Sequence, residues 1–216
     1  SCAVAPIQNI GAYGAEFADV AYKIYGYNFK THKFEIFTPN DLSFSYRKSK
    51  LQQMPEIFVT KIEIILNKNP QPNLSYKDLK NKFQDINPTL HEIRNTVLEI
   101  RDNKIPQPDK IGNAGSFFKN PICSKNELEI LTKKFPDICF FQYSDDKFKI
   151  SAAWLIEKAG WKGYREGDAG VSPNHSLILV NYGNATGQDI LNLANKIIES
   201  VKNIFDIKLE PEVKIL

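Results

Sequence analysis

The sequence of 216 residues has little of the cysteine and histidine that disulfide frameworks and metal sites require. Its three cysteines are odd in number and contain no C-x-x-C pair, which argues against both a disulfide scaffold and a zinc site. We expect these thiols to be buried or idle: Cys2, Cys123 and Cys139. The three histidines lack metal-site spacing, so no metal is predicted, and surface or capping roles are expected for His32, His91 and His175.

Long apolar runs and strong charge bias are also absent. No stretch of about 18 apolar residues occurs, and the first residues lack the basic flank of a secretory signal. We therefore expect a protein of the cytoplasm that has no membrane partner. The chain has 28 Lys and Arg against 25 Asp and Glu, but these residues form no basic stripe. A nucleic-acid partner is not expected.

With 42% hydrophobic and 12% aromatic residues, the chain has enough apolar material for one large domain or two small ones. β-Branched and aromatic residues predict strands of a mixed sheet over residues 20–29, 33–37 and 57–66. Helix-start signals occur at Ser75-x-x-Asp78 and Asn87-Pro88, and helical spacing predicts a helix over 88–101.

Pro106 and Pro108 interrupt the helical pattern, so we expect a domain boundary there, between residues 1–106 and 107–206. In the second part, Ser124-x-x-Glu127 and Thr186-x-x-Asp189 predict helix starts. The helix from Thr186 is expected to end near residue 205, and a shorter helix is expected over 152–159. Residues 176–182 and 207–216 read as strands. The fold class predicted is α+β, with a mixed sheet followed by a compact α+β unit.

The most informative stretch is Gly112-Asn-Ala-Gly-Ser-Phe-Phe-Lys-Asn-Pro121. Its small residues let the backbone approach a ligand and place Ser116 on a tight turn. The alternative is a plain glycine turn in which Ser116 caps a backbone donor. No G-x-S-x-G elbow or His/Asp relay accompanies Ser116, which disfavours an acyl-transfer serine.

This stretch resembles the signature of the UDP-N-acetylenolpyruvoylglucosamine reductase family. Three other segments resemble motifs of the same family in the same order. They are Pro6-Ile-Gln-Asn-Ile-Gly-Ala-Tyr-Gly14, Phe44-Ser-Tyr-Arg-Lys-Ser49 and Leu209-Glu-Pro-Glu-Val-Lys214. The resemblance implies an oxidoreductase of peptidoglycan synthesis that uses FAD and NADPH. Its substrate would be the enolpyruvyl ether of UDP-N-acetylglucosamine, which is reduced to UDP-N-acetylmuramate.

The resemblance also implies roles for individual residues. Ser116 matches the proton donor, and Arg47 and Glu212 match the pair that supports the enolate; Glu212 would hydrogen-bond the enol if protonated or orient the arginine if ionised. Substrate binding falls to Tyr46, Tyr76, Lys104, Asn120 and Lys214, the last replacing an arginine that is frequent in the family. Contacts to FAD, mainly through backbone, fall to Gln8, Asn9, Ile10, Gly11 and Ala12. From the residues alone, Tyr46 and Tyr76 read as half-buried packing aromatics and Lys104 as a solvated linker lysine.

In this comparison, residues 1–106 correspond to the second part of an FAD-binding domain, 107–206 to a substrate-binding domain, and 207–216 to a strand that carries Glu212. The amino-terminal half of the family, with its glycine-rich loop for the FAD pyrophosphate, has no counterpart in the sequence. We therefore expect that half to be supplied in cis or in trans. The alternative function is a non-catalytic nucleotide-sugar binding remnant. An oxidase of the same flavin superfamily is disfavoured by the Gly-Asn-Ala-Gly-Ser motif.

Overall fold

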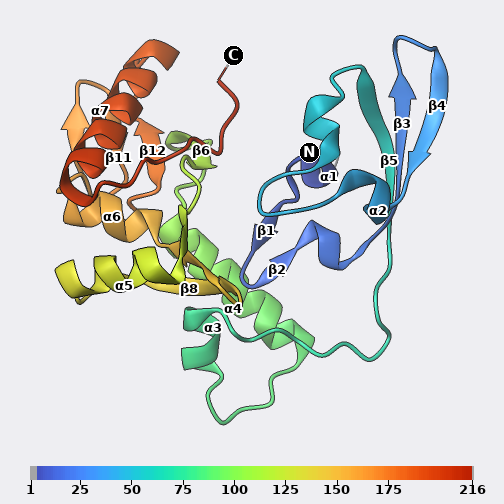
Figure 1. The fold of residues 1–216 in the computed structure, drawn as a ribbon, viewed down its shortest axis with the longest axis horizontal. Helices are drawn as coiled ribbons and strands as arrows, with labels where there is room; N and C mark the ends of the chain where they lie inside the picture. The colour runs from blue at the N-terminus through green and yellow to red at the C-terminus, as the bar shows by residue number, and fades with distance from the viewer. Residues whose placement is uncertain (1–3, 216) are drawn as a thin grey trace. The chain divides into compact units, whose positions relative to one another are not determined.

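A computed structural model describes residues 4–215 of the chain, which divides into two compact units, Ser1–Leu98 and Glu99–Leu216 (Figure 1). Helices and antiparallel sheets make up both units, which confirms the predicted α+β class. Cys2 lies outside the described residues, and Cys123 and Cys139 are free and half-buried. Within residues 4–215, no helix combines the length and the apolar character needed to span a bilayer.

The first unit is built on a three-stranded sheet of order β4-β3-β5. Its elements are α1 (Val4–Gln8), β1 (Gly11–Ala12), β2 (Ala15–Glu16), the 3-10 helix η1 (Phe17–Asp19), β3 (Ala21–Asn28), β4 (Lys33–Phe37), α2 (Pro39–Leu42), the 3-10 helix η2 (Lys50–Gln53), β5 (Ile57–Ile64) and α3 (Lys77–Lys82). The division between the units falls within α4 (Leu90–Lys104). The three predicted strands are confirmed to within two residues at each end. The expected mixed sheet is wrong, because every pairing in it is antiparallel. Residues 29–32 connect β3 to β4. A connection of this length can form a hairpin turn, but it is too short for the crossover that two parallel strands require.

The two faces of this sheet differ sharply in exposure. Ile24 pairs with Phe37 on the inner face, and both belong to a core with Phe17, Leu42, Leu51, Ile57 and Val59. Tyr27 pairs with Phe34 on the outer face, where Phe34 is 74% exposed while Phe37 is 9% exposed. Successive side chains of a strand point to opposite faces, so this contrast follows from the register of β4.

The second unit holds two further antiparallel sheets, β10-β11-β12-β6 and β7-β9-β8. Its elements after α4 are β6 (Gly112–Ser116), β7 (Ile122–Ser124), α5 (Lys125–Lys134), β8 (Phe140–Ser144), β9 (Lys147–Ile150), α6 (Ala152–Lys158), β10 (Arg165–Glu166), β11 (Ala169–Val171), β12 (Ile178–Asn181) and α7 (Gly187–Phe205). α7 buries a stripe at helical spacing, formed by Leu193, Ala194, Ile197, Val201 and Phe205. This stripe belongs to a core that is separate from that of the first unit.

Local capping chemistry determines where several helices begin. Ser124 with Glu127, and Thr186 with Asp189, form the capping boxes predicted from the sequence. The helix predicted from Asn87-Pro88 begins instead at Leu90. There, the Thr89 backbone N–H donates to Glu92 Oε2 at 2.8 Å and Glu92 N–H donates back to Thr89 Oγ1 at 3.3 Å. In α3 the N-cap position is Tyr76 instead of Ser75, and the Tyr76 side chain makes no capping hydrogen bond.

The strand predicted over residues 207–216 is wrong for the described part, 207–215. That segment makes a single isolated bridge, between Phe118 and Pro211. Proline has no backbone N–H, so Pro211 cannot extend a ladder of hydrogen bonds. Two backbone hydrogen bonds lie on either side of this bridge. Lys119 N–H donates to Glu210 O at 2.9 Å, and Glu212 N–H donates to Phe117 O at 2.7 Å.

Both tryptophans of the sequence lie in the second unit. Trp154, on α6, packs against Phe135 and Phe205, with ring centroids 6.5 and 5.6 Å apart. Trp161 contacts Tyr164 edge to face at 4.8 Å. Among the described residues, none accepts a hydrogen bond from the buried Trp161 Nε1. The Trp161 ring is half-buried at the edge of the core, and its buried Nε1 is an unsatisfied donor.

Candidate functional site

Arg47, one of the predicted catalytic residues, lies on a tight turn in the first unit. Ser45 and Lys48 exchange two backbone hydrogen bonds of 3.0 Å across this turn. Arg47 has a left-handed φ of 55°, and its carbonyl accepts from Gln52 Nε2 at 3.0 Å. A left-handed conformation costs a non-glycine residue on the order of 1 to 3 kcal/mol, so the surrounding hydrogen bonds must hold it in place.

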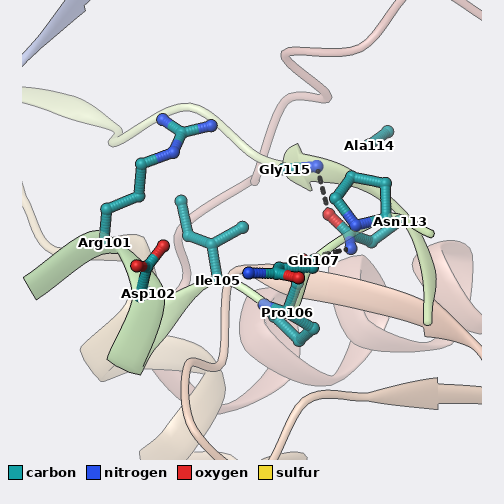
Figure 2. A pocket seen from close by; sticks show the side chains of 9 residues that line it. Arg101, Asp102, Ile105, Pro106, Gln107, Asn113, Ala114 and Gly115 are labelled. Carbon is teal, nitrogen blue, oxygen red and sulfur yellow. Dashed lines mark hydrogen bonds between the residues drawn. The ribbon is translucent and has the colours of Figure 1, made fainter. Parts of the chain in front are cut away.

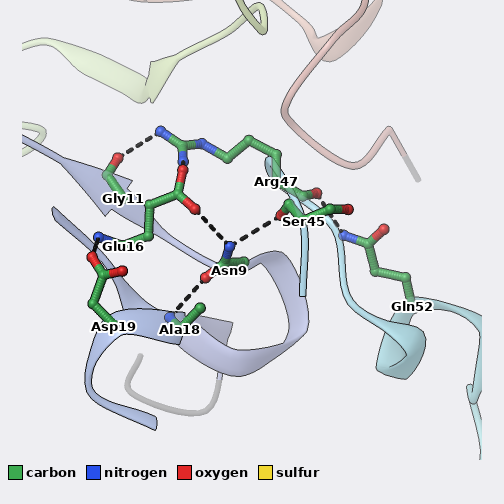
Figure 3. Close-up of polar contacts among 8 residues, drawn as sticks. All are labelled: Asn9, Gly11, Glu16, Ala18, Asp19, Ser45, Arg47 and Gln52. Atoms are coloured by element: carbon green, nitrogen blue, oxygen red, sulfur yellow. Dashed lines mark hydrogen bonds and ion pairs between the residues drawn. The ribbon is translucent and has the colours of Figure 1, made fainter. Parts of the chain in front are cut away.

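The guanidinium of Arg47 reaches back to the β1–β2 hairpin (Figure 3). Its Nη2 donates to the Gly11 carbonyl at 2.5 Å, and its Nη1 lies 3.9 Å from Glu16 Oε1. The guanidinium also lies over the Tyr46 ring, with Cζ 5.0 Å from the centroid. The Arg47 side chain is only 14% exposed. Arg47 is therefore brought onto the hairpin that carries Gly11 and Ala12, two of the predicted cofactor residues, and Tyr46 packs against its guanidinium.

Asn9 is the buried centre of this cluster. The residue is 1% exposed, and its Nδ2 donates to Glu16 Oε2 at 2.9 Å and to the Ser45 carbonyl at 3.0 Å. Its Oδ1 accepts from the Ala18 N–H at 2.9 Å. The side chain thus ties together the hairpin, the Arg47 turn and η1, and is turned inward (Figure 3). The 1% exposure covers the backbone of Asn9 as well as its side chain, so this residue shapes the hairpin from within.

The predicted cofactor residues occupy the end of α1 and strand β1: Gln8, Asn9, Ile10, Gly11 and Ala12. Ile10 and Ala12 are exposed, and Ile10 is an apolar side chain left open to solvent. Gly11 has no room for a side chain, because a Cβ there would lie 2.7 Å from Glu16 Cγ and 2.8 Å from the Ala15 carbonyl oxygen. The hairpin therefore presents small and apolar groups outward while its polar side chains point into the unit.

Tyr76, a predicted substrate residue, is also brought to this hairpin. Its ring contacts the Tyr13 ring edge to face, with centroids 5.1 Å apart. Close by in the sequence, Asn73 Nδ2 donates to the Gly14 carbonyl at 2.6 Å. The segment that precedes α3 is thus fastened to the tip of the hairpin.

Ser116 ends strand β6 in the second unit, in place of the turn that was predicted. It pairs with Ile178 of β12, and a bulge interrupts the register between Ile178 and Val180. Gly115, in this bulge, has a left-handed φ of 73°. The Gly115 N–H donates to Asn113 Oδ1 at 3.0 Å. The glycine of the motif therefore bends the strand directly before Ser116, as glycines in bulges do.

Glu212 is brought next to the Ser116 segment by the chain's last residues. Its N–H donates to the carbonyl of Phe117, the residue that follows Ser116. Phe117 and Phe118 are buried and anchor this segment in the core of the second unit. Ser116 and Glu212, which are far apart in the sequence, are therefore close neighbours in the fold.

Three other predicted substrate residues also lie in the second unit. Asn120 Oδ1 accepts from the Ala152 N–H at 2.9 Å, at the start of α6. Lys104 ends α4, and Lys214 is exposed near the end of the described chain. Burial lowers the pKa of His175, and the charges of Lys104 and Lys162 lower it further.

A pocket of about 300 Å³ opens beside the Gly-Asn-Ala-Gly-Ser motif (Figure 2). Its walls include Arg101 and Asp102 from α4, Gln107 after the helix, and Asn113 and Gly115 from β6. This volume is at the lower end of the range for small-molecule sites. Within residues 4–215, no three His, Cys, Asp or Glu side chains come together as metal ligands.

The sequence prediction missed Glu16, the carboxylate that faces Arg47. The hairpin turn at Tyr13 and Gly14, with φ values of 53° and 88°, pairs Gly11 with Glu16. A Gly-Ala-Tyr-Gly stretch indicates such a two-residue hairpin, so the register that sets Glu16 opposite Gly11 was available as a signal. Arg101 in the pocket carried no comparable signal.

Comparison with known proteins gives a consistent set of similarities. A family model described as the carboxy-terminal domain of UDP-N-acetylenolpyruvoylglucosamine reductase matches residues 107–216. The chain is 43% identical to the UDP-N-acetylenolpyruvoylglucosamine reductase of Flavobacterium johnsoniae, across 98% of the chain and 64% of that protein. It is 40% identical to the reductase of the same name from Xanthomonas axonopodis pv. citri, across 98% of the chain and 62% of that protein.

Among solved structures, the chain is similar to the crystal structure of UDP-N-acetylenolpyruvylglucosamine reductase from Thermus caldophilus. The TM-score is 0.63 at 25% identity, and the match covers 98% of this chain and 59% of that one. The chain thus spans about three fifths of the length of the relatives it matches.

Proposed function

The chain belongs to the UDP-N-acetylenolpyruvoylglucosamine reductase family, and we propose that it takes part in reducing UDP-N-acetylenolpyruvoylglucosamine to UDP-N-acetylmuramate for peptidoglycan synthesis. The observation that carries the proposal is the hydrogen bond of the Glu212 N–H to the Phe117 carbonyl, 2.7 Å long. It holds a carboxyl-bearing residue beside Ser116, and this reaction needs a proton donor supported by a second polar group. A cytoplasmic location is part of the same proposal.

FAD is the cofactor that we propose, with NADPH as the hydride donor. The β1–β2 hairpin fits a flat ring system, because exposed Ile10 and Ala12 flank Gly11, which has no side chain. Residues 8–12 would line the cofactor mainly through backbone atoms. Once reduced by NADPH, the bound flavin would supply a hydride to C3 of the enolpyruvyl ether.

Arg47 would bind the carboxylate of the enolpyruvyl group and stabilise the enolate that forms as C3 accepts the hydride. A guanidinium has five N–H donors in a planar fork, which suits a carboxylate better than the single point charge of a lysine. The partly buried position of Arg47 strengthens this interaction, since solvent screens it less than on an open surface.

Ser116 would then deliver its hydroxyl proton to C2 of the enolate. The serine oxygen becomes negative as the proton leaves, so nearby cations or dipoles must stabilise it. Glu212 would assist either as a protonated acid that hydrogen-bonds the enol or as an orienting carboxylate.

The nucleotide sugar would be bound by the two tyrosines, two lysines and one amide predicted from the sequence: Tyr46, Tyr76, Lys104, Asn120 and Lys214. A diphosphate is best bound by cations and N–H donors. The bond from Ala152 N–H fixes the orientation of the Asn120 amide at the start of α6.

An anaerobic assay on the full-length, FAD-loaded protein tests the proposal. NADPH should bleach the flavin absorbance, and the enolpyruvyl substrate should then restore it with formation of UDP-N-acetylmuramate. If the protein is instead a nucleotide-sugar binding module, calorimetry should detect UDP-sugar binding while the flavin signal stays unchanged on adding substrate. That result would reject the reductase proposal.

A further inference from the structure

The side chain of Arg47 is held by groups from the hairpin, and none of those groups was assigned a role with Arg47 from the sequence. Gly11 supplies a carbonyl at 2.5 Å from Nη2, and Glu16 supplies a carboxylate oxygen at 3.9 Å from Nη1. These two residues are directly paired across β1 and β2. The strand pair therefore accepts a hydrogen bond from Nη2 and places a carboxylate at ion-pair distance from Nη1 (Figure 3).

Glu16 is itself fixed at several points. Its Oε2 accepts from Asn9 Nδ2 at 2.9 Å, and its backbone N–H donates to Asp19 Oδ2 at 2.7 Å. Asn9 uses its remaining bonds on the Ser45 carbonyl and the Ala18 N–H. Because Ser45 begins the turn that carries Arg47, the same amide holds both the Glu16 carboxylate and the start of that turn.

The packing in this cluster leaves little freedom. A Cβ at position 11 would lie 3.0 Å from Arg47 Nη1 as well as 2.7 Å from Glu16 Cγ. The side chains of Arg47 and Glu16 are 14% and 31% exposed. A partly buried guanidinium needs a compensating charge, since an unpaired charge in such a place is strongly unfavourable.

We infer that Glu16 is a positioning residue for Arg47, and that buried Asn9 fixes Glu16 in that role. This inference rests on the proposed function, in which Arg47 binds the substrate carboxylate. Glu16 sets the rotation of the guanidinium fork from the side of the hairpin that would line the cofactor. The fork thereby keeps a fixed orientation toward the substrate while the substrate accepts the hydride.

A double-mutant cycle in the full-length, FAD-loaded enzyme tests the inference. Glu16→Gln keeps the size and an oxygen acceptor but removes the charge. We expect the rate of substrate reduction to fall by roughly 10- to 100-fold, as for a misplaced reacting group. Flavin reduction by NADPH, measured on the same sample by stopped-flow absorbance, should change by less than about twofold, because Arg47 takes no part in it.

The decisive comparison is made in the Arg47→Lys background. If Glu16 acts through Arg47, Glu16→Gln should slow this variant by no more than about a further twofold, because residues in one network are not additive. Glu35→Gln is the matched control, since Glu35 also accepts from a buried asparagine, Asn28, at 2.7 Å in the same unit. It should leave both half-reactions unchanged.

Three results would overturn the positioning role of Glu16 alone. They are a Glu16→Gln enzyme that reduces substrate at the wild-type rate, one that slows both half-reactions alike, and one whose effect adds in full to that of Arg47→Lys. A wild-type enzyme that leaves the substrate unreduced overturns the proposed function, and the inference with it. If Glu16→Gln lowers the yield of folded protein, Glu16→Asp, which keeps the charge on a shorter side chain, goes through the same cycle with the same criteria.

Discussion

Gly11 is the residue at which backbone, carboxylate and guanidinium approach most closely in the first unit. Gly11→Ala should destabilise the protein by about 1 to 3 kcal/mol, because the new methyl group meets Glu16 Cγ at 2.7 Å and the Ala15 carbonyl oxygen at 2.8 Å. Urea unfolding measures this loss. Gly187→Ala is the control, since nothing lies within 4 Å of a Cβ at the start of α7.

Replacing Gly187 should instead leave stability unchanged or raise it by about 0.4 to 1 kcal/mol, since alanine restricts the unfolded chain. Equal losses from both glycines would mean that crowding at Gly11 is not the cause.

Ser116 should separate the two half-reactions of the proposed enzyme. In Ser116→Ala, reduction of FAD by NADPH should stay near the wild-type rate, while substrate reduction should slow by roughly 10²- to 10⁴-fold. Ser116→Cys should lie between, because a thiol still supplies a proton. Stopped-flow flavin absorbance resolves both steps. Equal slowing of the two steps in Ser116→Ala would remove the proton-donor role and favour a purely structural serine beside the Gly115 bulge.

At the scale of single elements, strand β4 offers a direct test of its register. Phe37, 9% exposed, belongs to the core, whereas Phe34, 74% exposed, lies on the opposite face of the same strand. Phe37→Ala should therefore cost about 3 to 5 kcal/mol. Phe34→Ala should cost about 1 kcal/mol or less, since it loses only surface ring contacts such as that with Tyr27. Comparable losses of unfolding free energy in the two variants, measured by thermal or urea unfolding, would show that β4 does not face the core with Phe37.

The connection between β11 and β12 should respond to pH. His175 Nδ1 accepts from the Leu177 N–H at 3.2 Å, and burial holds the pKa of His175 below its ordinary value. The unfolded state then binds more protons in mild acid. The stability supplied by neutral His175 is complete above about pH 6.5 and is lost as the pH falls from there through the lower folded pKa.

His175→Asn, which retains an acceptor, should flatten this loss when unfolding midpoints are compared between neutral and mildly acidic buffers. The exposed His91→Asn should keep the wild-type dependence. A wild-type slope in His175→Asn would assign the acid sensitivity to another group.

Elements with local signals were predictable, and those that depend on distant pairing were not. Ser124 with Glu127 and Thr186 with Asp189 mark helix starts through bonds made within four residues. The strand expected over 207–216 failed because β-branched residues favour extension but do not determine a partner. The actual partner is the Phe117–Lys119 segment, and Pro211 limits the pairing to one bridge. The helix start moved from Pro88 to Leu90 because Thr89 and Glu92 exchange capping hydrogen bonds there.

At the scale of the whole molecule, the candidate site could be predicted only in part. Arg47, Ser116 and Glu212 were identified because they lie within motifs that resemble those of a family. Glu16 was missed because its importance comes from the register of a hairpin and from a buried amide, and neither appears as a motif. The domain limits predicted at residues 106 and 206 remain predictions. The two compact units of the structure divide after Leu98.

Trp154 and Trp161, both within residues 99–216, determine what fluorescence can report about this chain. Selective excitation of the indoles follows the second unit alone, while far-UV circular dichroism follows both. Because each unit has its own core, Phe37→Ala should shift the dichroism curve in urea and leave the emission curve in place. A shift of both curves together would mean that the units unfold as one.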